Sequence, residues 1–227
     1  TAALMNHDGI ATILATGGNA MVKAAYSCGK PALGVGAGNV PAYIEKSADL
    51  RQAAHDIVMS KSFDNGMVCA SEQAVIIDKE VYDEFVEEFK SYHTYFVNKK
   101  EKALLEEFCF GAKANSKNCA GAKLNADIVG KPATWIAEQA GFKVPAETNI
   151  LAAECAEVGE NEPLTREKLS PVIAVLKAED TEDGLKKARQ MVEFNGLGHS
   201  AAIHTKDEEL AKRFGTEIKA MRIIWNS

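Results

Sequence analysis

The sequence predicts an α/β protein in which helices flank a mostly parallel sheet. From Gln73 to the end of the chain, apolar runs typical of strands alternate with helical patterns. Near the start, an apolar run ends in a glycine pair, and a helical stretch follows it. Hydrophobic residues make up 46% of the 227 residues, as expected for a soluble globular chain of this class.

Several elements are expected before the middle of the chain. Strands are predicted over residues 11–16, 32–39, 40–45 and 73–77, and helices over residues 19–28, 49–60 and 79–91. Ser47 is the expected N-cap of the helix over residues 49–60, and Asp78 that of the helix over residues 79–91, because their side-chain oxygens accept hydrogen bonds from free backbone N–H groups. The lysines and glutamates from Lys99 to Glu107, Glu106 included, are expected to form a solvated helix face.

The second half continues the alternation of strands and helices. A helix is expected from Pro132 to about Gly141, because proline is favoured at the first helical position. Strands are predicted over residues 150–155, 171–177, 200–204 and 222–225, and helices over residues 181–194 and 207–219. We expect the last of these strands to be buried.

Composition excludes several classes of function. The formal net charge of −6 gives no basic footprint for nucleic acid, and no apolar run approaches the roughly 20 residues of a membrane span. The cysteines are odd in number and form no C-x-x-C pair, so neither a metal site nor a disulfide framework is indicated, and a reducing, cytoplasmic setting is favoured. They are Cys28, Cys69, Cys109, Cys119 and Cys155. Because the chain opens at Thr1 with sequence typical of a domain interior, we expect a piece of a longer protein.

The segment SFDNGMVCASE, residues 62–72, holds Cys69 among small and flexible residues. Asn65 and Gly66 form an Asn-Gly turn signal. A thiol at such a loop tip is open to a small substrate and becomes a strong nucleophile as its thiolate. The alternative is a buried cysteine packed as a small hydrophobe. Similarly, Gly17 and Gly18 either form a plain turn or place backbone N–H groups of a helix start near an anion.

Five segments together resemble the aldehyde dehydrogenases, from about residue 4 to residue 225. They are ILATGG, GKPALGVGAGNVP, SFDNGMVCASEQ, EPLTREKLSP and NGLGHS, in that order. The similarity is greatest to the CoA-acylating branch, and within it to the aldehyde dehydrogenase half of the bifunctional aldehyde-alcohol dehydrogenases. The resemblance implies an aldehyde dehydrogenase-like fold, in which residues 1–38 close a Rossmann-type dinucleotide-binding domain and residues 39–227 form the catalytic domain.

The resemblance also implies roles for single residues. Cys69 is the expected nucleophile, His199 a proton-exchanging group beside it, and Asn65 a residue that orients the loop. Glu167, in EKLSP, matches the glutamate that holds the nicotinamide ribose, while Gly17 and Gly18 are expected near the cofactor. For Glu167 the alternative is a solvated surface charge, and for His199 a structural histidine.

Val35 indicates the branch of the family. Hydrolytic members carry a water-activating glutamate in E-L-G-G before the cysteine, and the aligned residues here are VGAG, with no Asp or Glu between Gly9 and Pro41. At pH 7, ionising bulk water costs about 12 kcal/mol, against about 2 kcal/mol for a free thiol. A site without the base therefore favours a thiol acceptor over water.

The sequence thus predicts a reversible NAD-dependent acetaldehyde dehydrogenase that acylates CoA through a thioester on Cys69. The alternatives are a hydrolytic aldehyde dehydrogenase and a non-catalytic assembly scaffold. The expected partners are a small aldehyde and CoA, with no metal, nucleic acid or membrane, and a homo-oligomer that becomes a filament in the full-length parent. Because half of the Rossmann unit is missing, we expect these residues alone to bind NAD weakly and to lack activity.

Overall fold

The computed structural model describes residues 1–117 and 119–227. Most of the chain forms one body around a seven-stranded sheet of order β5-β6-β7-β4-β3-β8-β9, in which every neighbouring pair is parallel. The strands are β3 (Val40–Ile44), β4 (Glu72–Asp78), β5 (Thr94–Phe96), β6 (Ile150–Glu154), β7 (Val172–Ala178), β8 (Gly198–His204) and β9 (Ala220–Trp225). The predicted α/β class with a mostly parallel sheet is confirmed.

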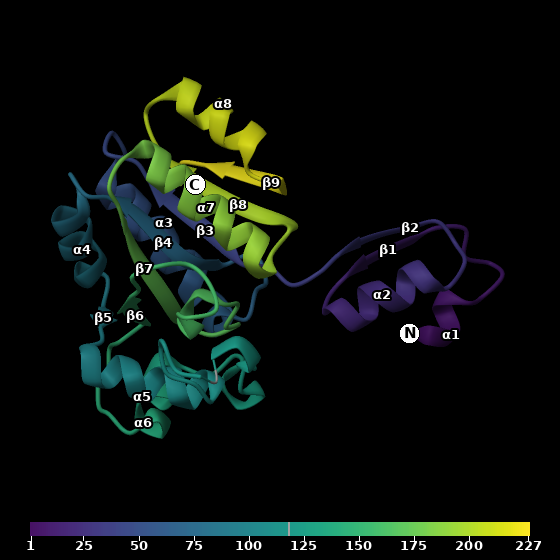
Figure 1. Ribbon diagram of the computed structural model, residues 1–227, viewed down its shortest axis with the longest axis horizontal. Coiled ribbons are helices and arrows are strands. Elements are labelled where there is room, and N and C mark those ends of the chain that lie inside the picture. The colour runs from purple at the N-terminus through teal and green to yellow at the C-terminus, as the bar shows by residue number, and fades with distance from the viewer. Residues whose placement is uncertain (118) are drawn as a thin grey trace.

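Helices cover both faces of this sheet (Figure 1). One apolar core joins it to α3 (Leu50–Ser62) and α4 (Tyr82–Ser91). The other joins it to α5 (Lys99–Phe110), α6 (Ala133–Ala140), α7 (Thr181–Asn195) and α8 (Glu208–Glu217). Because successive strand residues point to opposite faces, β4 gives Val75 and Ile77 to the first core and Ala74 and Ile76 to the second. None of the described helices has the length and apolar character needed to cross a membrane.

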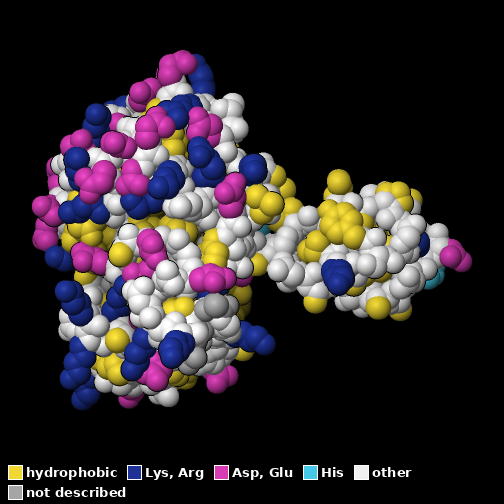
Figure 2. Space-filling model, in the orientation of Figure 1, with side chains coloured by type: hydrophobic (Ala, Val, Ile, Leu, Met, Phe, Trp, Pro, Cys, Tyr) yellow, Lys and Arg dark blue, Asp and Glu magenta, His cyan; other side chains and the backbone are white. Residues whose placement is uncertain are grey.

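The N-terminal elements form a separate, smaller unit. They are α1 (Ala2–Met5), β1 (Ile13–Thr16), α2 (Asn19–Ser27) and β2 (Ala32–Val35), and β1 and β2 make a parallel two-stranded sheet of their own. Figure 1 shows this unit projecting from the body on one extended segment. Its paired residues Leu14 and Leu33 are 79% and 68% exposed, and the unit shows few charged side chains in Figure 2.

The two predicted helix caps are wrong. Helix α3 begins at Leu50, so the residue that precedes its first turn is Asp49, whose carboxylate accepts the N–H of Gln52 at 3.1 Å. Ser47 lies two residues earlier and hydrogen-bonds to the Glu45 carboxylate instead. Serine and aspartate both make good caps, so the outcome depends on where the first turn starts.

Asp78 belongs to the end of β4 and not to a helix. Its carboxylate is buried and accepts the Tyr43 hydroxyl at 2.8 Å and the Lys46 N–H at 3.1 Å. Helix α4 begins only at Tyr82, after an N-cap at Val81 that makes no side-chain cap bond. The Asp78 carboxylate, which we predicted to cap a helix, therefore accepts hydrogen bonds from residues distant in the sequence.

The expected solvated face of α5 is also partly wrong. Glu106 is only 2% exposed, and its carboxylate accepts the Ala114 N–H at 2.8 Å. Lys102 lies 3.6 Å from Glu106 and 2.8 Å from the buried Glu162. The long lysine side chain thus bridges two buried carboxylates, a contact between distant segments that local charge patterning does not reveal.

The last strand is not buried as expected. Strand β9 pairs only with β8 and forms an edge of the sheet. Met221 is 71% exposed and Trp225 46% exposed, while Ile223 and Ile224 are half-buried. An apolar run of this length fits both a central and an edge strand, so the pattern alone does not distinguish them.

Candidate active site

The Cys69 loop connects the end of α3 to β4 through a tight reversal. The chain passes through a 3-10 turn, η1 (Phe63–Gly66), in which Asp64, Asn65 and Gly66 have φ values of 50°, 50° and 69°. A Cβ at Gly66 would lie 2.6 Å from the Ser170 carbonyl, so this position requires glycine. The predicted Asn-Gly turn is confirmed, and it leaves Cys69 partly exposed.

Asn65 ties this loop to another part of the body. Its side-chain N–H donates to the carbonyl of Gly130 at 3.0 Å, 65 residues further along the chain. The residue does not line the cavity that holds Cys69. Its expected role in orienting the loop stays a prediction, and this contact is the one through which such a role would act.

Cys69 opens into a cavity of about 480 Å³ between the body and the N-terminal unit. Gly17, Gly18 and Glu167 line the same cavity. Four of the six residues singled out from the sequence therefore meet in one place, although they are up to 150 residues apart. The remaining lining residues are Thr16, Gly36, Ala37, Asp64, Met67, Val68 and Leu169.

The glycine pair leaves the start of α2 open toward this cavity. Gly18 is the N-cap of α2, no side chain caps the helix, and a Cβ at Gly18 would meet nothing within 4 Å. Gly17 donates its N–H to the Val35 carbonyl at 3.1 Å, which fixes the turn against β2. An uncapped helix start with free space before it is suited to an anionic group.

Glu167 joins the cavity to the segment between the two units. Its Oε1 atom accepts the N–H of Gly38 at 3.0 Å. Partial burial raises the pKa of the Glu167 carboxyl, whereas the Gly38 N–H and the charges of Lys61 and Lys168 lower it. Glu167 is thus a half-buried hydrogen-bond acceptor in the cavity and not a solvated surface charge.

His199 lies behind the cavity and does not line it. It is 4% exposed, and its Nδ1 atom is 3.1 Å from the Ser200 hydroxyl. A Cβ at Gly38 would lie 3.1 Å from the His199 ring and 2.4 Å from the Cys69 carbonyl. Only the backbone of Gly38 therefore lies between the His199 ring and the backbone of Cys69. Burial, and then the charge of Arg222, lower the pKa of His199, so this histidine is neutral at pH 7. Its predicted role in proton exchange stays a prediction.

Two lysines beneath the loop are buried, and the sequence did not indicate this. Lys168 is fully buried and donates to the carbonyls of Gln73, Leu164 and Arg166 at 3.1, 2.6 and 2.7 Å. Burial lowers its pKa to about 7. Lys61 is also fully buried, on the apolar stripe of α3. Its spacing of four residues after Ile57 was the available signal.

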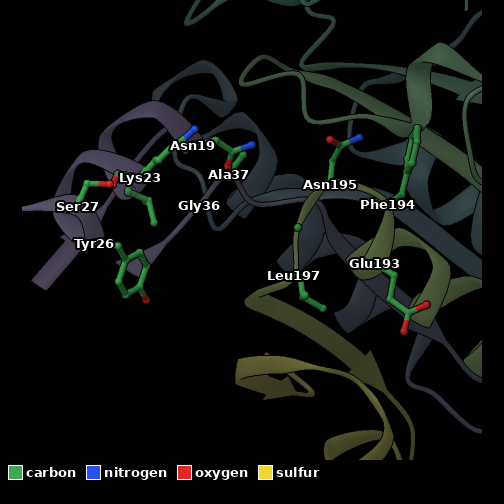
Figure 3. Close-up of a pocket in the computed structure, with 12 residues that line it drawn as sticks. Asn19, Lys23, Tyr26, Ser27, Gly36, Ala37, Glu193, Phe194, Asn195 and Leu197 are labelled. Atoms are coloured by element: carbon green, nitrogen blue, oxygen red, sulfur yellow. The ribbon is translucent and has the colours of Figure 1, made fainter. Parts of the chain in front are cut away.

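A second hollow of about 570 Å³ adjoins the same connecting segment (Figure 3). Its walls are α2, with Asn19, Lys23 and Tyr26, and the end of α7 with the residues after it. Gly36 and Ala37 border both this hollow and the Cys69 cavity. Two residues of the segment that connects β2 to β3 therefore lie between the two openings.

Comparison with known proteins defines the class. The family model described as "Aldehyde dehydrogenase family" matches residues 1–227, and the chain belongs to this family. It is 88% identical over 227 residues to an aldehyde-alcohol dehydrogenase of Streptococcus pneumoniae. The matched region covers 100% of this chain and 26% of that protein. The resemblance seen in the sequence, including that to the aldehyde-alcohol dehydrogenases, is confirmed.

Solved structures agree with this assignment. An acetylating aldehyde dehydrogenase from Geobacillus thermoglucosidasius has a TM-score of 0.90 at 42% identity, with 100% of this chain and 48% of that chain covered. A propionaldehyde dehydrogenase from Rhodopseudomonas palustris, solved with bound CoA and an acylated cysteine, has a TM-score of 0.85 at 27% identity, with 99% and 49% covered. The predicted aldehyde dehydrogenase-like fold is confirmed, and the chain spans about a quarter to a half of the proteins that it matches.

Proposed function

We propose that this chain carries the nucleophile of an NAD-dependent, CoA-acylating aldehyde dehydrogenase that acts on a small aldehyde such as acetaldehyde. One observation carries the proposal: Cys69 opens into a cavity with Glu167 and the uncapped start of α2, while the aliphatic Val35 ends β2 where hydrolytic members have their carboxylate. The names of the relatives support it, since they include acetylating and aldehyde-alcohol dehydrogenases.

The chemistry follows from the thiol. The Cys69 thiolate adds to the carbonyl carbon of the aldehyde, which forms a C–S bond and a thiohemiacetal. A dinucleotide held between the start of α2 and Glu167 would supply the acceptor for a hydride from this carbon, and the hydroxyl proton would leave to solvent as the carbonyl forms. Cys69 then holds a thioester, which the CoA thiolate attacks, so that the bond to Cys69 breaks and an acyl-CoA leaves. Because a thioester is a reactive acyl donor, the same steps run in reverse.

The residues present fit a dinucleotide. The free N–H groups at the start of α2 and the open space before Gly18 suit a pyrophosphate, and the Glu167 carboxylate is a hydrogen-bond acceptor suited to ribose hydroxyls. NAD is the proposed form. A related engineered glycolyl-CoA reductase, 27% identical, was solved with NADP+, so the choice between the two is part of the proposal.

A hydrolytic rival has one observation in its favour. Although Val35 cannot take a proton, the carboxylates of Asp64 and Glu167 line the Cys69 cavity, and burial raises the pKa of Glu167. A carboxyl with a raised pKa is a better proton acceptor for water activation. Gly38 already occupies one oxygen of Glu167 at 3.0 Å, which leaves less of this carboxylate for a water molecule.

The experiment that separates the two follows the acyl group on Cys69. The chain is acetylated with acetyl-CoA, freed of reagents, and left either in buffer or with CoA while mass spectrometry records the acyl group. We expect fast loss with CoA and slow loss in buffer. Loss in buffer that is as fast as loss to CoA would replace the acylating function with the hydrolytic one.

We extend the proposal to organisation and setting. Residues 1–38 are the proposed closing part of the dinucleotide-binding domain and residues 39–227 the catalytic domain, because β1 and β2 form a sheet separate from that of the body. All five cysteines are free, which supports a reducing, cytoplasmic setting. A homo-oligomer, and a filament of the full-length parent, rest on the family resemblance alone.

A further inference from the structure

Two of the three consecutive residues 167–169 line the Cys69 cavity. Glu167 and Leu169 belong to its wall, whereas Lys168 between them does not and is fully buried. The middle residue therefore extends into the body while both of its neighbours face the cavity. Whatever holds Lys168 in place also bears on the position of the Glu167 carboxylate.

The side chain of Lys168 joins its own segment to the sheet. Its Nζ atom donates to the carbonyls of Leu164 and Arg166 at 2.6 and 2.7 Å, both in the turn that leads to Glu167. It also donates to the carbonyl of Gln73 at 3.1 Å, on β4 and 95 residues away in the sequence. An ammonium has three N–H groups, so these three carbonyls use all of them.

The side chain of Gln73 completes the connection to the Cys69 loop. It is fully buried, and its Oε1 atom accepts the backbone N–H of Lys168 at 3.0 Å. Its Nε2 atom donates to the carbonyl of Ser71 at 3.2 Å. The N–H of Ser71 in turn donates to the carbonyl of Val68 at 3.0 Å, across Cys69. Hydrogen bonds therefore run without a break from the Cys69 loop to the residue after Glu167.

The backbone beyond Lys168 shows that this segment is held tightly. Leu169 has a φ of 46°, which bulky residues rarely adopt. Such a conformation persists only where the surroundings fix it. The Leu169 carbonyl accepts the N–H of Gly130 at 3.1 Å, and the Gly130 carbonyl accepts the side chain of Asn65 in the Cys69 loop.

We propose that Lys168 and Gln73 are positioning residues, which fasten the Glu167 turn to the strand after the Cys69 loop and so set where the Glu167 carboxylate lies in the cavity. Neither of the two lines the cavity, so they act through Glu167. The hydrogen bond from the Gly38 N–H to the Glu167 Oε1 atom at 3.0 Å depends on this position. The inference rests on the proposed function only for what Glu167 binds, the ribose of the dinucleotide.

The hydrogen bond between Gly38 and Glu167 provides the test. NMR of the nitrogen-15 labelled chain follows the Gly38 amide proton as pH falls from 7, a range in which Lys168, with a pKa of about 7, keeps its ammonium. Protonation of Glu167 weakens the acceptor, so this proton should move upfield. Glu167→Gln should abolish that response, and any response left belongs to other groups, such as Asp64, which lines the same cavity.

Lys168→Met should lose the Gly38 response, because the Glu167 turn is no longer fastened to β4. Lys61→Met is the matched control, since it also removes a fully buried lysine, but one whose Nζ atom has no hydrogen-bond partner among the described residues. This control should keep the response. If Lys168 served stability alone, Lys168→Met would unfold more easily and still show the response in its folded state.

Gln73→Met covers the case in which Lys168→Met does not fold. It keeps the size of the side chain and adds no charge, and it removes both side-chain hydrogen bonds while the Gln73 carbonyl stays available to Lys168. We expect a weaker Gly38 response in this variant. A response equal to that of the unaltered chain in each folded variant of Lys168 and Gln73 overturns the inference. Because the titration needs no aldehyde, CoA or dinucleotide, that result would leave the proposed function untouched.

Discussion

The two sheets of this chain differ in how well their apolar residues are covered. The seven-stranded sheet is packed on both faces, with residues such as Ile76 and Val75 fully buried. In the described part of the chain, the N-terminal unit has four buried apolar residues, which are Met5, Ile13, Ala15 and Ala25. Because burial of apolar area is the main stabilising contribution, the body should be stable by itself and the N-terminal unit much less so.

This difference matters for the cavity, which takes residues from both units. Cys69 and Glu167 belong to the body, whereas Gly17 and Gly18 belong to the N-terminal unit. The connecting segment is held at the body by Asn39, whose side-chain N–H groups donate to the carbonyls of Thr165 and Met191 at 2.9 and 3.0 Å. The body therefore fixes Cys69, the proposed nucleophile, while Gly17 and Gly18, which we propose to face the phosphates, depend on the unit with the smaller core.

The largest expected effect is in hydrogen exchange. Amide protons of β4 and β7 should exchange only on global unfolding, whereas those of β1 and β2 should exchange through local opening. With a global free energy of unfolding in the ordinary range, the protection factors should differ by at least about a thousandfold. Mass spectrometry of peptides from the two regions measures this. Equal protection would mean that the two units unfold together.

A pair of core substitutions is expected to show the next largest effect. Phe85 is fully buried in α4, and its ring centroid lies 5.2 Å from that of Phe89. The substitution Phe85→Ala should lower the free energy of unfolding by about 3–5 kcal/mol. Ile13→Ala should change the free energy of unfolding of the body by less than about 0.5 kcal/mol, because Ile13 packs in the separate core of the N-terminal unit. Denaturant titration followed by tryptophan fluorescence is suitable, because Trp135 and Trp225 both lie in the body.

A similar loss in both variants would contradict the comparison, because it would show that the small core of the N-terminal unit contributes to the stability of the body. A loss of stability only in Phe85→Ala would support the comparison between the two units, since the fluorescence midpoint would then report the unfolding of the body alone.

The fold could be predicted from the sequence wherever an element's own residues decide its structure. Strand β4 and helix α6 were predicted because β-branched runs, Pro132 and Gly141 act locally, and Gly141 indeed has φ of 95° as a helix C-cap. The role of Asp78 was mistaken because its partner, Tyr43, lies 35 residues away. The exposure of β9 depends on the sheet order, which no local pattern contains.

The candidate site divides in the same way. Cys69, Gly17, Gly18 and Glu167 lie in recognisable segments, and the structure brings them to one cavity. Asp64 was overlooked, although it stands in the same FDNG turn, because its exposure to the cavity depends on a φ of 50°. Lys61 and Lys168 were overlooked because lysine is usually solvated, and only the packed structure shows them buried.

A smaller effect is expected from pH, and it should appear in the body only. His204 on β8 is 3% exposed, and burial lowers its pKa to about 4 from 6.5, against an opposing effect of Asp56. As pH falls from about 6.5 to about 4, the unfolded chain takes up a proton that the folded chain does not, so stability falls by up to about 3 kcal/mol.

The check is denaturant unfolding at several pH values with His204→Gln beside the unaltered chain. The carboxylates titrate alike in both, so the difference isolates His204, and the variant should lose less stability on acidification. His7→Gln, an exposed histidine of the N-terminal unit, is the matched control. Parallel pH profiles for all three proteins would show that His204 is not buried as described.

The central claim is that Cys69 accepts an acyl group from CoA, and one measurement tests it most directly. The chain is incubated with acetyl-CoA at pH 7 without any dinucleotide, and peptide mass spectrometry locates the acetyl group. We expect one acetyl thioester on Cys69, reversed by free CoA and absent in Cys69→Ser, while Cys28, a half-buried cysteine outside the cavity, stays unmodified. Acetylation of Cys28 and Cys69 at equal rates, or of neither, would contradict the account.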